Sequence, residues 1–386
     1  MQVDDLILTK SLGKGAFGEV FLTTKQGSKE YYATKRLDRA FSEKPENIKR
    51  LANEISLLKK INHPNIVKLI DLKKTKSHCY IVMEYCNGGD LSGCLKKYKA
   101  AYKRPFPEEV VQYIMRQVVS GIAFLHSHKI MHRDLKLDNI LVTFNSESDK
   151  NSLNMMKAIV KIIDFGFATR LKSDLTFTVL GTPANMDPQI LSNMQSRTPN
   201  PGYDEKADIW SLGTLCYEML VGHMAFSGQS MQELTMKVKQ GTYFLPTNLS
   251  KEVVSFIEGM LQKDPKQRLS AQELAKHDFL VKNVRQFHNL DTRKIPGVVQ
   301  NGGFMTVNAN QGNKVNKLHE TVWDIFAQPM PSVPKIPTSN QPYGVQMMAQ
   351  PQMQVYNQGM YSRPQMQMGQ QQYVQQPGFN KNMYGY

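Results

Sequence analysis

Two short runs contain side chains suited to phosphoryl transfer: His132-Arg133-Asp134-Leu135-Lys136-Leu137-Asp138-Asn139 and, 25 residues after Asn139, Asp164-Phe165-Gly166. Asp134 could accept the proton of an attacking hydroxyl group. Asn139 and Asp164 offer the hard oxygen ligands that Mg²⁺ prefers. The spacing of these groups predicts a site that moves a phosphoryl group with the help of a metal ion.

A glycine-rich stretch stands upstream, Gly13-Lys14-Gly15-Ala16-Phe17-Gly18-Glu19-Val20. Backbone without a Cβ can approach phosphate groups closely, so this stretch is a candidate cover for a nucleotide. An ordinary hairpin turn is the simpler alternative, and a dinucleotide-binding fold is another. The dinucleotide fold needs a helix directly after the glycines, whereas Val20 to Leu22 is a strand pattern. The pattern therefore argues against that fold.

Two charged residues follow at positions that would let them meet. Lys35 ends the alternating segment Tyr32-Ala33-Thr34-Lys35, which places Ala33 and Lys35 on one face of a strand. Glu54 lies nineteen residues later, on a segment whose apolar residues at 51, 55 and 58 predict a helix. Alone, each would be an ordinary polar surface residue. Together, the glutamate would hold the lysine against the phosphates.

These motifs in this order, with Asp208-Ile209-Trp210-Ser211-Leu212-Gly213, resemble the eukaryotic protein kinase family over about residues 4–280. The resemblance implies an α+β fold of two lobes. A small, mainly antiparallel β lobe with one regulatory helix would span about 4–86, and a larger, mainly helical lobe about 87–280. ATP and Mg²⁺ are the implied cofactors. Because tyrosine kinases carry a different residue in place of Lys136, serine and threonine hydroxyls of protein substrates are the implied acceptors.

The resemblance also assigns roles to residues. Asp134 would orient the acceptor hydroxyl, Lys136 would neutralise the γ-phosphate during transfer, and Asn139 and Asp164 would bind Mg²⁺. These four are the expected catalytic residues. The residues expected around ATP are Leu12, Gly13, Lys14, Gly15, Ala16, Phe17, Gly18, Val20, Ala33, Lys35, Glu54, Met83, Glu84, Cys86, Asp90 and Leu141.

Part of that set would enclose the adenine. Met83 is expected behind the ring, and the Glu84 and Cys86 backbone at its edge. The roof and the floor would be formed by Val20, Ala33 and Leu141. Each apolar member could equally be ordinary core. Asp90 follows a Gly-Gly pair and would either contact the ribose or cap a helix.

Control is expected between Phe167 and Thr182. Thr178 occupies the family's activation-loop position, where an upstream kinase would add a phosphate that pairs with Arg133 and orders the loop. Unmodified, Thr178 is simply a loop threonine. The resemblance places Thr178, Arg133 and Thr182 in this regulatory segment.

The sequence departs from the family at Asp187-Pro188-Gln189, where kinases usually have Ala-Pro-Glu, and at Asn185, where they have an aromatic residue. The family pairs the missing glutamate with an arginine, here Arg268. We therefore expect Arg268 to lose its charged partner, because a neutral glutamine makes weaker bonds. Restoring the charge with Gln189→Glu would then raise thermal stability.

The subfamily is indicated by Glu84 to Leu91, by Phe167-Ala168, and by a polar insertion from Thr143 to Lys157. These segments resemble the ULK kinases, which initiate autophagy. Calcium/calmodulin-type kinases share much of the pattern, but no Asp-x-Asp-x-Asp-Gly calcium loop occurs. A catalytically silent ATP-binding scaffold is an alternative of another class, although such proteins commonly lose the base or the metal ligands that this chain keeps.

Charge and composition exclude several other classes. Of the net charge of +15, residues 281–386 contribute nine Lys/Arg and three Asp/Glu, or +6, which leaves a diffuse +9. We see no strong nucleic-acid signal. No run of about 18 apolar residues and no signal-peptide pattern occurs, so a cytoplasmic, or alternatively nuclear, protein is expected. The four cysteines show no metal-ligand spacing.

Composition changes sharply near the end of the chain. Residues 341–386 contain thirteen Gln and seven Met, so we expect a disordered tail over 331–386 that is passive, binds partners, or associates weakly with itself. A linker is expected over 281–330. Within it, apolar residues at 318, 322, 325 and 326 predict a short docking helix.

Overall fold

The structure is a computed structural model that describes residues 2–15, 18–38, 45–165, 168–170, 182–195, 202–282, 298–301 and 304–308. All of these belong to one compact unit, residues 1–323, and the second unit, 324–386, lies outside them. The predicted tail, the predicted docking helix, Ala16, Phe17 and Thr178 also lie outside the described residues.

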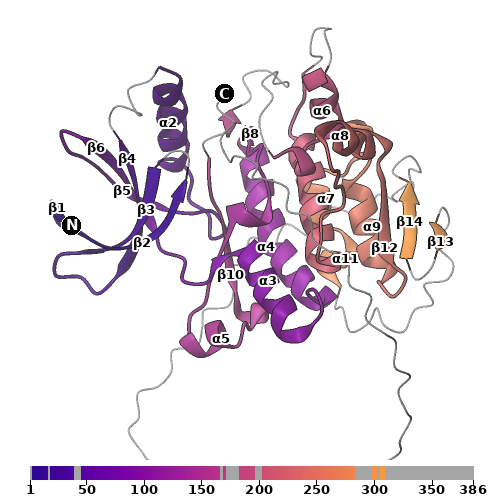
Figure 1. Ribbon diagram of the computed structural model, residues 1–386, viewed down its shortest axis with the longest axis horizontal. Helices are drawn as coiled ribbons and strands as arrows, with labels where there is room; N and C mark the ends of the chain where they lie inside the picture. Colours follow the sequence, from indigo (N-terminus) through magenta and orange to yellow (C-terminus); the bar gives the residue numbers. More distant parts are fainter. Residues whose placement is uncertain are drawn as a thin grey trace, which may run out of the picture. The chain divides into compact units, whose positions relative to one another are not determined.

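The first lobe is a six-stranded antiparallel sheet in the order β1-β2-β3-β4-β6-β5 (Figure 1). The strands are β1 (Gln2–Val3), β2 (Leu6–Gly15), β3 (Gly18–Lys25), β4 (Tyr31–Asp38), β5 (Leu69–Lys74) and β6 (His78–Glu84). Alternation along these strands buries Leu6, Tyr80 and Val82 in a small core. Helix α2 (Pro45–Leu58) accompanies the sheet and carries Glu54.

The second lobe is mainly helical. Its longer helices are α3 (Leu91–Tyr102), α4 (Glu108–Ser127), α6 (Pro188–Gln195), α7 (Lys206–Val221), α8 (Met231–Gln240) and α9 (Lys251–Met260). Its shorter helices are α5 (Glu147–Asn151), α10 (Ala271–Ala275) and α11 (Asp278–Val281). Helix α7 is buried almost throughout because its sequence is apolar on every face, and it ends at Gly222, whose φ of 84° suits glycine. The structure thus shows the two-lobed kinase fold expected from the sequence.

Short strands position the candidate catalytic residues. Strands β7 (Gly89–Asp90), β9 (Ile140–Thr143) and β10 (Ile159–Ile162) form one sheet, and β8 (Ile130–Met131) pairs with β11 (Thr169–Arg170). The 3₁₀ turns are η1 (Leu137–Asn139), η2 (Met155–Lys157), η3 (Pro183–Asn185) and η4 (Pro265–Gln267). Ile140 pairs with Ile162, and the Ile163 N–H donates to the Asn139 carbonyl at 3.0 Å. This pairing brings the candidate catalytic run, residues 132–139, next to the segment that contains Asp164.

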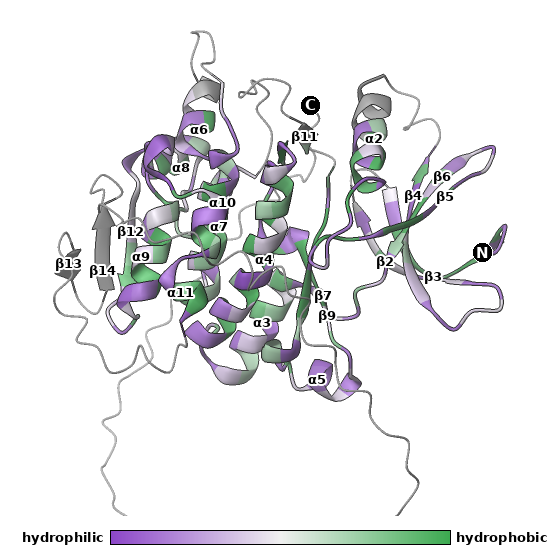
Figure 2. Ribbon diagram, turned by 180° about the vertical axis from the view of Figure 1, so that it is seen from behind, coloured by the Kyte–Doolittle hydropathy of each residue, from purple (hydrophilic) through white to green (hydrophobic). Residues whose placement is uncertain are grey.

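The polar insertion from Thr143 to Lys157 forms α5 and η2. Figure 2 shows α5 as hydrophilic, next to the hydrophobic strand β9. Tyr102 on α3 donates a hydrogen bond to the Ser152 carbonyl at 3.4 Å, and Met155 is buried. The insertion is therefore held on the second lobe by this hydrogen bond from α3 and by the burial of Met155.

A third small sheet differs from the expectation of a linker over 281–330. Strand β12 (Thr242–Pro246) pairs with β14 (Phe304–Asn308), which pairs in turn with β13 (Val298–Asn301). All the pairings are antiparallel. Part of the segment beyond residue 280 is thus joined to the second lobe. Among the described residues, no helix is long and apolar enough to span a membrane.

A partly buried histidine, His277, makes the stability of this lobe depend on pH. Burial lowers the pKa of His277 to about 4, and its Nδ1 accepts the Phe279 N–H at 3.2 Å, which requires a neutral ring. Its stabilising contribution is therefore complete above the unfolded pKa of about 6.5 and is lost as the pH falls towards 4. We expect a loss of about 1–2 kcal/mol after allowing for partial solvent exposure.

The measurement is the free energy of unfolding in urea at pH 7 and at pH 4.5, for the wild type and for His277→Asn. Asparagine keeps a cap for α11 but does not titrate. The variant should therefore lose less stability on acidification, and equal losses in both proteins would contradict this assignment.

Candidate active site

Asp134 is the buried centre of a cluster of hydrogen bonds, with only 5% of its surface exposed. The Asn139 side-chain amide donates to the Asp134 Oδ2 at 3.0 Å and to its backbone carbonyl at 2.7 Å. The Thr182 hydroxyl donates to Oδ1 at 2.8 Å, and the Lys136 Nζ lies 3.0 Å from Oδ2. Because Lys136 also donates to the Thr182 hydroxyl at 3.0 Å, the three groups hold one another in place.

Asp208 at the start of α7 holds the backbone ahead of Asp134. It is fully buried, and it accepts the N–H groups of His132 at 2.9 Å and Arg133 at 2.8 Å, together with the His126 side chain at 2.9 Å. Although burial opposes its charge, these partners lower the pKa of Asp208, so it stays ionised. Arg133 has a φ of 71°, a strained conformation that the bonds to Asp208 stabilise.

Asp164 lies beside this loop, also with a left-handed backbone, at φ 64°. The His132 ring hydrogen-bonds the Ile163 carbonyl at 2.8 Å and meets the buried Phe165 ring edge-on at 5.3 Å. The residues on both sides of Asp164 are thus fixed to the catalytic run. Its carboxylate is close enough to Glu54 to raise the pKa of Glu54.

Lys35 and Glu54 form the ion pair that the sequence suggests. The Lys35 Nζ lies 3.6 Å from the Glu54 Oε1, and Glu54 is 7% exposed. Burial is the main cause of the raised pKa of Glu54, and Asp164 adds to it while Lys35 opposes it. Helix α2 is connected to the segment after Asp164, because the Asn53 amide donates to the Ala168 carbonyl at 2.6 Å. Lys35, Glu54 and Asp164 therefore share one region.

The glycine-rich segment forms the β2–β3 hairpin, with Gly15 paired to Gly18. Gly18 has a φ of 139°, and an added Cβ would lie 2.1 Å from the Arg36 carbonyl oxygen, so only glycine fits. Leu12, Gly13 and Lys14 are exposed on β2, and an added Cβ on Gly13 would meet no atom within 4 Å. This side of the hairpin leaves room for a ligand.

Three of the residues expected around the adenine, Val20, Ala33 and Met83, lie on β3, β4 and β6. Val20 pairs with Lys35, and Ala33 pairs with Met83. The next residue, Glu84, uses its side chain to bind Lys161 at 2.9 Å and the Lys68 N–H at 2.7 Å. Cys86 is buried, and burial raises the pKa of its thiol.

Asp90 takes the capping role that the sequence left open. Its Oδ1 accepts the Gly93 N–H at 2.7 Å at the start of α3. Its strand β7 places it opposite Leu141 on β9. A contact between Asp90 and a ribose stays a prediction.

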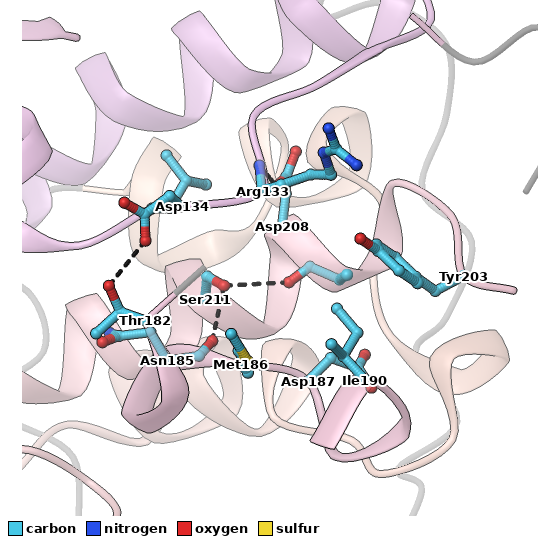
Figure 3. Close-up of a pocket in the computed structure, with 12 residues that line it drawn as sticks. Arg133, Asp134, Thr182, Asn185, Met186, Asp187, Ile190, Tyr203, Asp208 and Ser211 are labelled. Carbon is cyan, nitrogen blue, oxygen red and sulfur yellow. Dashed lines mark hydrogen bonds between the residues drawn. The ribbon is translucent and has the colours of Figure 1, made fainter. Parts of the chain in front are cut away.

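Arg133 and Thr182 line a small pocket beneath the catalytic loop (Figure 3). Burial raises the pKa of Tyr203, and a hydrogen bond with the Arg133 side chain opposes that rise. Asn185, in place of the family's aromatic residue, donates to the Thr214 hydroxyl at 2.9 Å and accepts the Ser211 hydroxyl on its carbonyl at 2.8 Å. These bonds fix the segment after Thr182 to α7.

The expectation that Arg268 lacks a charged partner is wrong. Asp187, two residues before Gln189, forms a buried ion pair with the Arg268 guanidinium. Both side chains are at most 2% exposed, and the guanidinium also donates to the carbonyls of Gln262 at 2.6 Å and Lys206 at 2.9 Å. Gln189 is exposed, and its N–H donates to Asp187. Asp187 therefore supplies the negative charge that pairs with Arg268, in place of the glutamate that is missing at position 189.

The residues present are compatible with Mg²⁺ held jointly by the protein and a nucleotide. Among the described residues, no group of three or more His, Cys, Asp or Glu could hold a metal alone. Mg²⁺ commonly takes one or two protein ligands and completes its shell with phosphate and water. The Asn139 Nδ2 donates to Asp134, so the other side-chain atom of Asn139, its Oδ1, is the candidate metal ligand. The Asp164 carboxylate is the second candidate ligand.

A family model of the protein kinase domain matches residues 6–280. This match agrees with the two lobes, the Lys35–Glu54 ion pair and the loop around Asp134. The chain therefore belongs to the protein kinase family, in its serine/threonine group.

Several relatives of this domain are serine/threonine-protein kinases named PLK4. The chain is 30% identical over 337 residues to that of Danio rerio, covering 86% of this chain and 33% of the relative. It is 32% identical over 282 residues to that of Drosophila grimshawi (72% and 34%), and 31% over 299 residues to that of Xenopus tropicalis (77% and 29%). The chain spans about a third of the length of these relatives. The finer resemblance to ULK kinases is not supported by them.

Proposed function

We propose that the chain transfers the γ-phosphate of ATP to serine or threonine hydroxyls of protein substrates. The observation that carries this proposal is the contact of Asp134 with both Lys136 and Thr182. The Thr182 hydroxyl donates to Oδ1 of Asp134 at 2.8 Å, so a hydroxyl group already fits against the candidate base. A substrate hydroxyl placed there would be oriented by the same carboxylate.

The remaining residues divide the electrostatic work. Bound Mg²⁺ would neutralise phosphate charge, with Asn139 and Asp164 as its protein ligands. Lys35, held by Glu54 at 3.6 Å, would bind the phosphates from the other lobe, and Lys136 would face the transferring group. Catalysis of this kind depends on positioning and on charge more than on covalent steps.

The alternative of a catalytically silent ATP-binding scaffold is less favoured. Such a scaffold would bind ATP without needing a base held by three partners, as Asp134 is held by Asn139, Thr182 and Lys136. Phosphorylation of a peptide array by the purified chain with labelled ATP and Mg²⁺ separates the two. We expect phosphoserine and phosphothreonine, and no label after EDTA is added. Labelled phosphotyrosine alone, or no transfer, would overturn the proposal.

We propose that phosphorylation of Thr178 by an upstream kinase raises activity. Thr178 lies outside the described residues, and the support comes from Arg133, which is fixed beside the base and carries the positive charge that a phosphate would pair with. Thr178→Ala should lower kcat about tenfold or more while leaving ATP affinity unchanged.

The comparison for this switch uses protein phosphorylated to completion, with occupancy checked by mass spectrometry. Thr178→Ser is the matched control, because it keeps an acceptor hydroxyl. Equal turnover of the alanine variant and the phosphorylated wild type would contradict the switch.

The PLK4 relatives favour a PLK4-like catalytic domain over a ULK-like or calcium/calmodulin-type one. An autophagy role therefore has no support beyond the initial resemblance. The cytoplasmic or nuclear location and a binding role for the tail stay predictions from the sequence.

A further inference from the structure

Strand β12 receives a piece of chain from beyond the kinase domain. The matched domain ends at residue 280, whereas β14 and β13 come from 298–308. Five residues of β14 pair in antiparallel register with the five residues of β12, from Thr242 with Asn308 to Pro246 with Phe304. The whole of β12 is thus covered along one edge.

Two independent observations show which backbone groups of β12 face β14. The Tyr217 hydroxyl on α7 donates to the Phe244 carbonyl at 2.7 Å, so the polar groups of Phe244 point towards α7. Because successive residues of a strand point their N–H and C=O groups to opposite edges, those of Tyr243 and Leu245 point towards β14.

The pairing of β13 with β14 shows independently which backbone groups of β14 face β12. Asn301 pairs with Phe304, which leaves two residues, Gly302 and Gly303, between the strands. In a hairpin of this length the closing pair exchanges hydrogen bonds within the hairpin. Counting from Phe304, the N–H groups of Met305 and Val307 then point away from β13 and towards β12. They lie opposite Leu245 and Tyr243, respectively.

Strand β12 is also fixed firmly enough to act as a template. Tyr243 and Leu245 are 1% and 0% exposed, and the Tyr243 ring packs edge-on against Tyr217 at 6.0 Å and Phe226 at 6.2 Å. A rigid strand whose backbone groups project from one edge needs hydrogen-bond partners there. An extended segment supplies them through its main chain.

We propose that β12 is a strand-acceptor edge and that residues 298–308 of the same chain are its ligand. Fifteen residues, 283–297, lie between Lys282, which follows α11, and this ligand. They can reach about 50 Å when extended, so the strand can be supplied within one molecule. The inference depends on the sheet and not on the proposed phosphotransfer.

Amide hydrogen exchange in the full chain tests this proposal. Met305→Pro removes an N–H that faces β12, whereas Gln300→Pro is the matched control, because its N–H faces the outer edge of the hairpin. We expect the Tyr243 and Leu245 amides to exchange at least about tenfold faster in Met305→Pro and at the wild-type rate in Gln300→Pro. The Ile257 amide in α9 should be unchanged in both.

Supply of the strand from outside provides the second arm. A synthetic peptide of residues 298–308, added to the Met305→Pro chain, should restore slow exchange at Tyr243 and Leu245. The same peptide N-methylated at Val307 should not. Unchanged exchange in Met305→Pro, or no rescue by the unmodified peptide, would overturn the proposal. Wild-type protection that is lost on dilution, together with dissociation of a dimer, would show that the strand comes from a second copy, and would overturn the intramolecular assignment.

Discussion

An Asp134→Asn variant is expected to lose a factor of about 10²–10⁴ in kcat. Asparagine keeps the shape of the side chain, and it can still meet Thr182, but it can no longer accept a proton or attract Lys136 by charge. ATP affinity should change little, because we expect the phosphates to be bound by Lys35 and by Mg²⁺ on Asn139 and Asp164. Steady-state kinetics with a peptide substrate and a fluorescent nucleotide titration measure the two quantities separately.

The matched control is Asp138→Asn, which removes the same charge from an exposed position in the same loop. Its kcat should stay within a factor of about three of the wild type. A turnover of Asp134→Asn within tenfold of the wild type would show that Asp134 is not the base.

The second large effect is expected at the buried anchor. Asp187→Asn should lower the free energy of unfolding by about 3 kcal/mol, because it leaves the Arg268 guanidinium buried without a counter-charge. Gln189→Glu should change it by less than about 0.5 kcal/mol, because that side chain is exposed. Urea unfolding at pH 7.5 measures both variants.

A double variant separates charge from packing at the same place. Asp187→Leu with Arg268→Met replaces the pair by apolar side chains of similar size, and should be more stable than Asp187→Asn alone. Strong stabilisation by Gln189→Glu, with a neutral effect of Asp187→Asn, would mean that the anchor lies at 189 after all.

The catalytic cluster could be predicted because its chemistry restricts residue types at short spacings. Asp134, Asn139 and Asp164 are identified as candidates in this way, and the two-lobed fold is implied by the family resemblance that the motifs carry. The role of Asp208 was not visible, although its motif was, because its bonds to the backbone of His132 and Arg133 depend on the tertiary fold.

Two other features were not predicted from the sequence, for different reasons. Asp187 meets Arg268 across 81 positions of the chain, and the family pattern drew attention to Gln189 instead. The hairpin at 298–308 did carry a local signal, Asn301-Gly302-Gly303 between alternating apolar residues, which favours a two-residue turn. That signal was overlooked within a segment interpreted as a linker.

The most direct test of the account is a crystal structure of the chain with Mg²⁺ and a non-hydrolysable ATP analogue. We expect the metal to bind the Asn139 oxygen and the Asp164 carboxylate at about 2.1 Å, with the γ-phosphate beside Lys136 and facing Asp134. A nucleotide bound elsewhere, or Asn139 and Asp164 too far apart to share a metal ion, would contradict it.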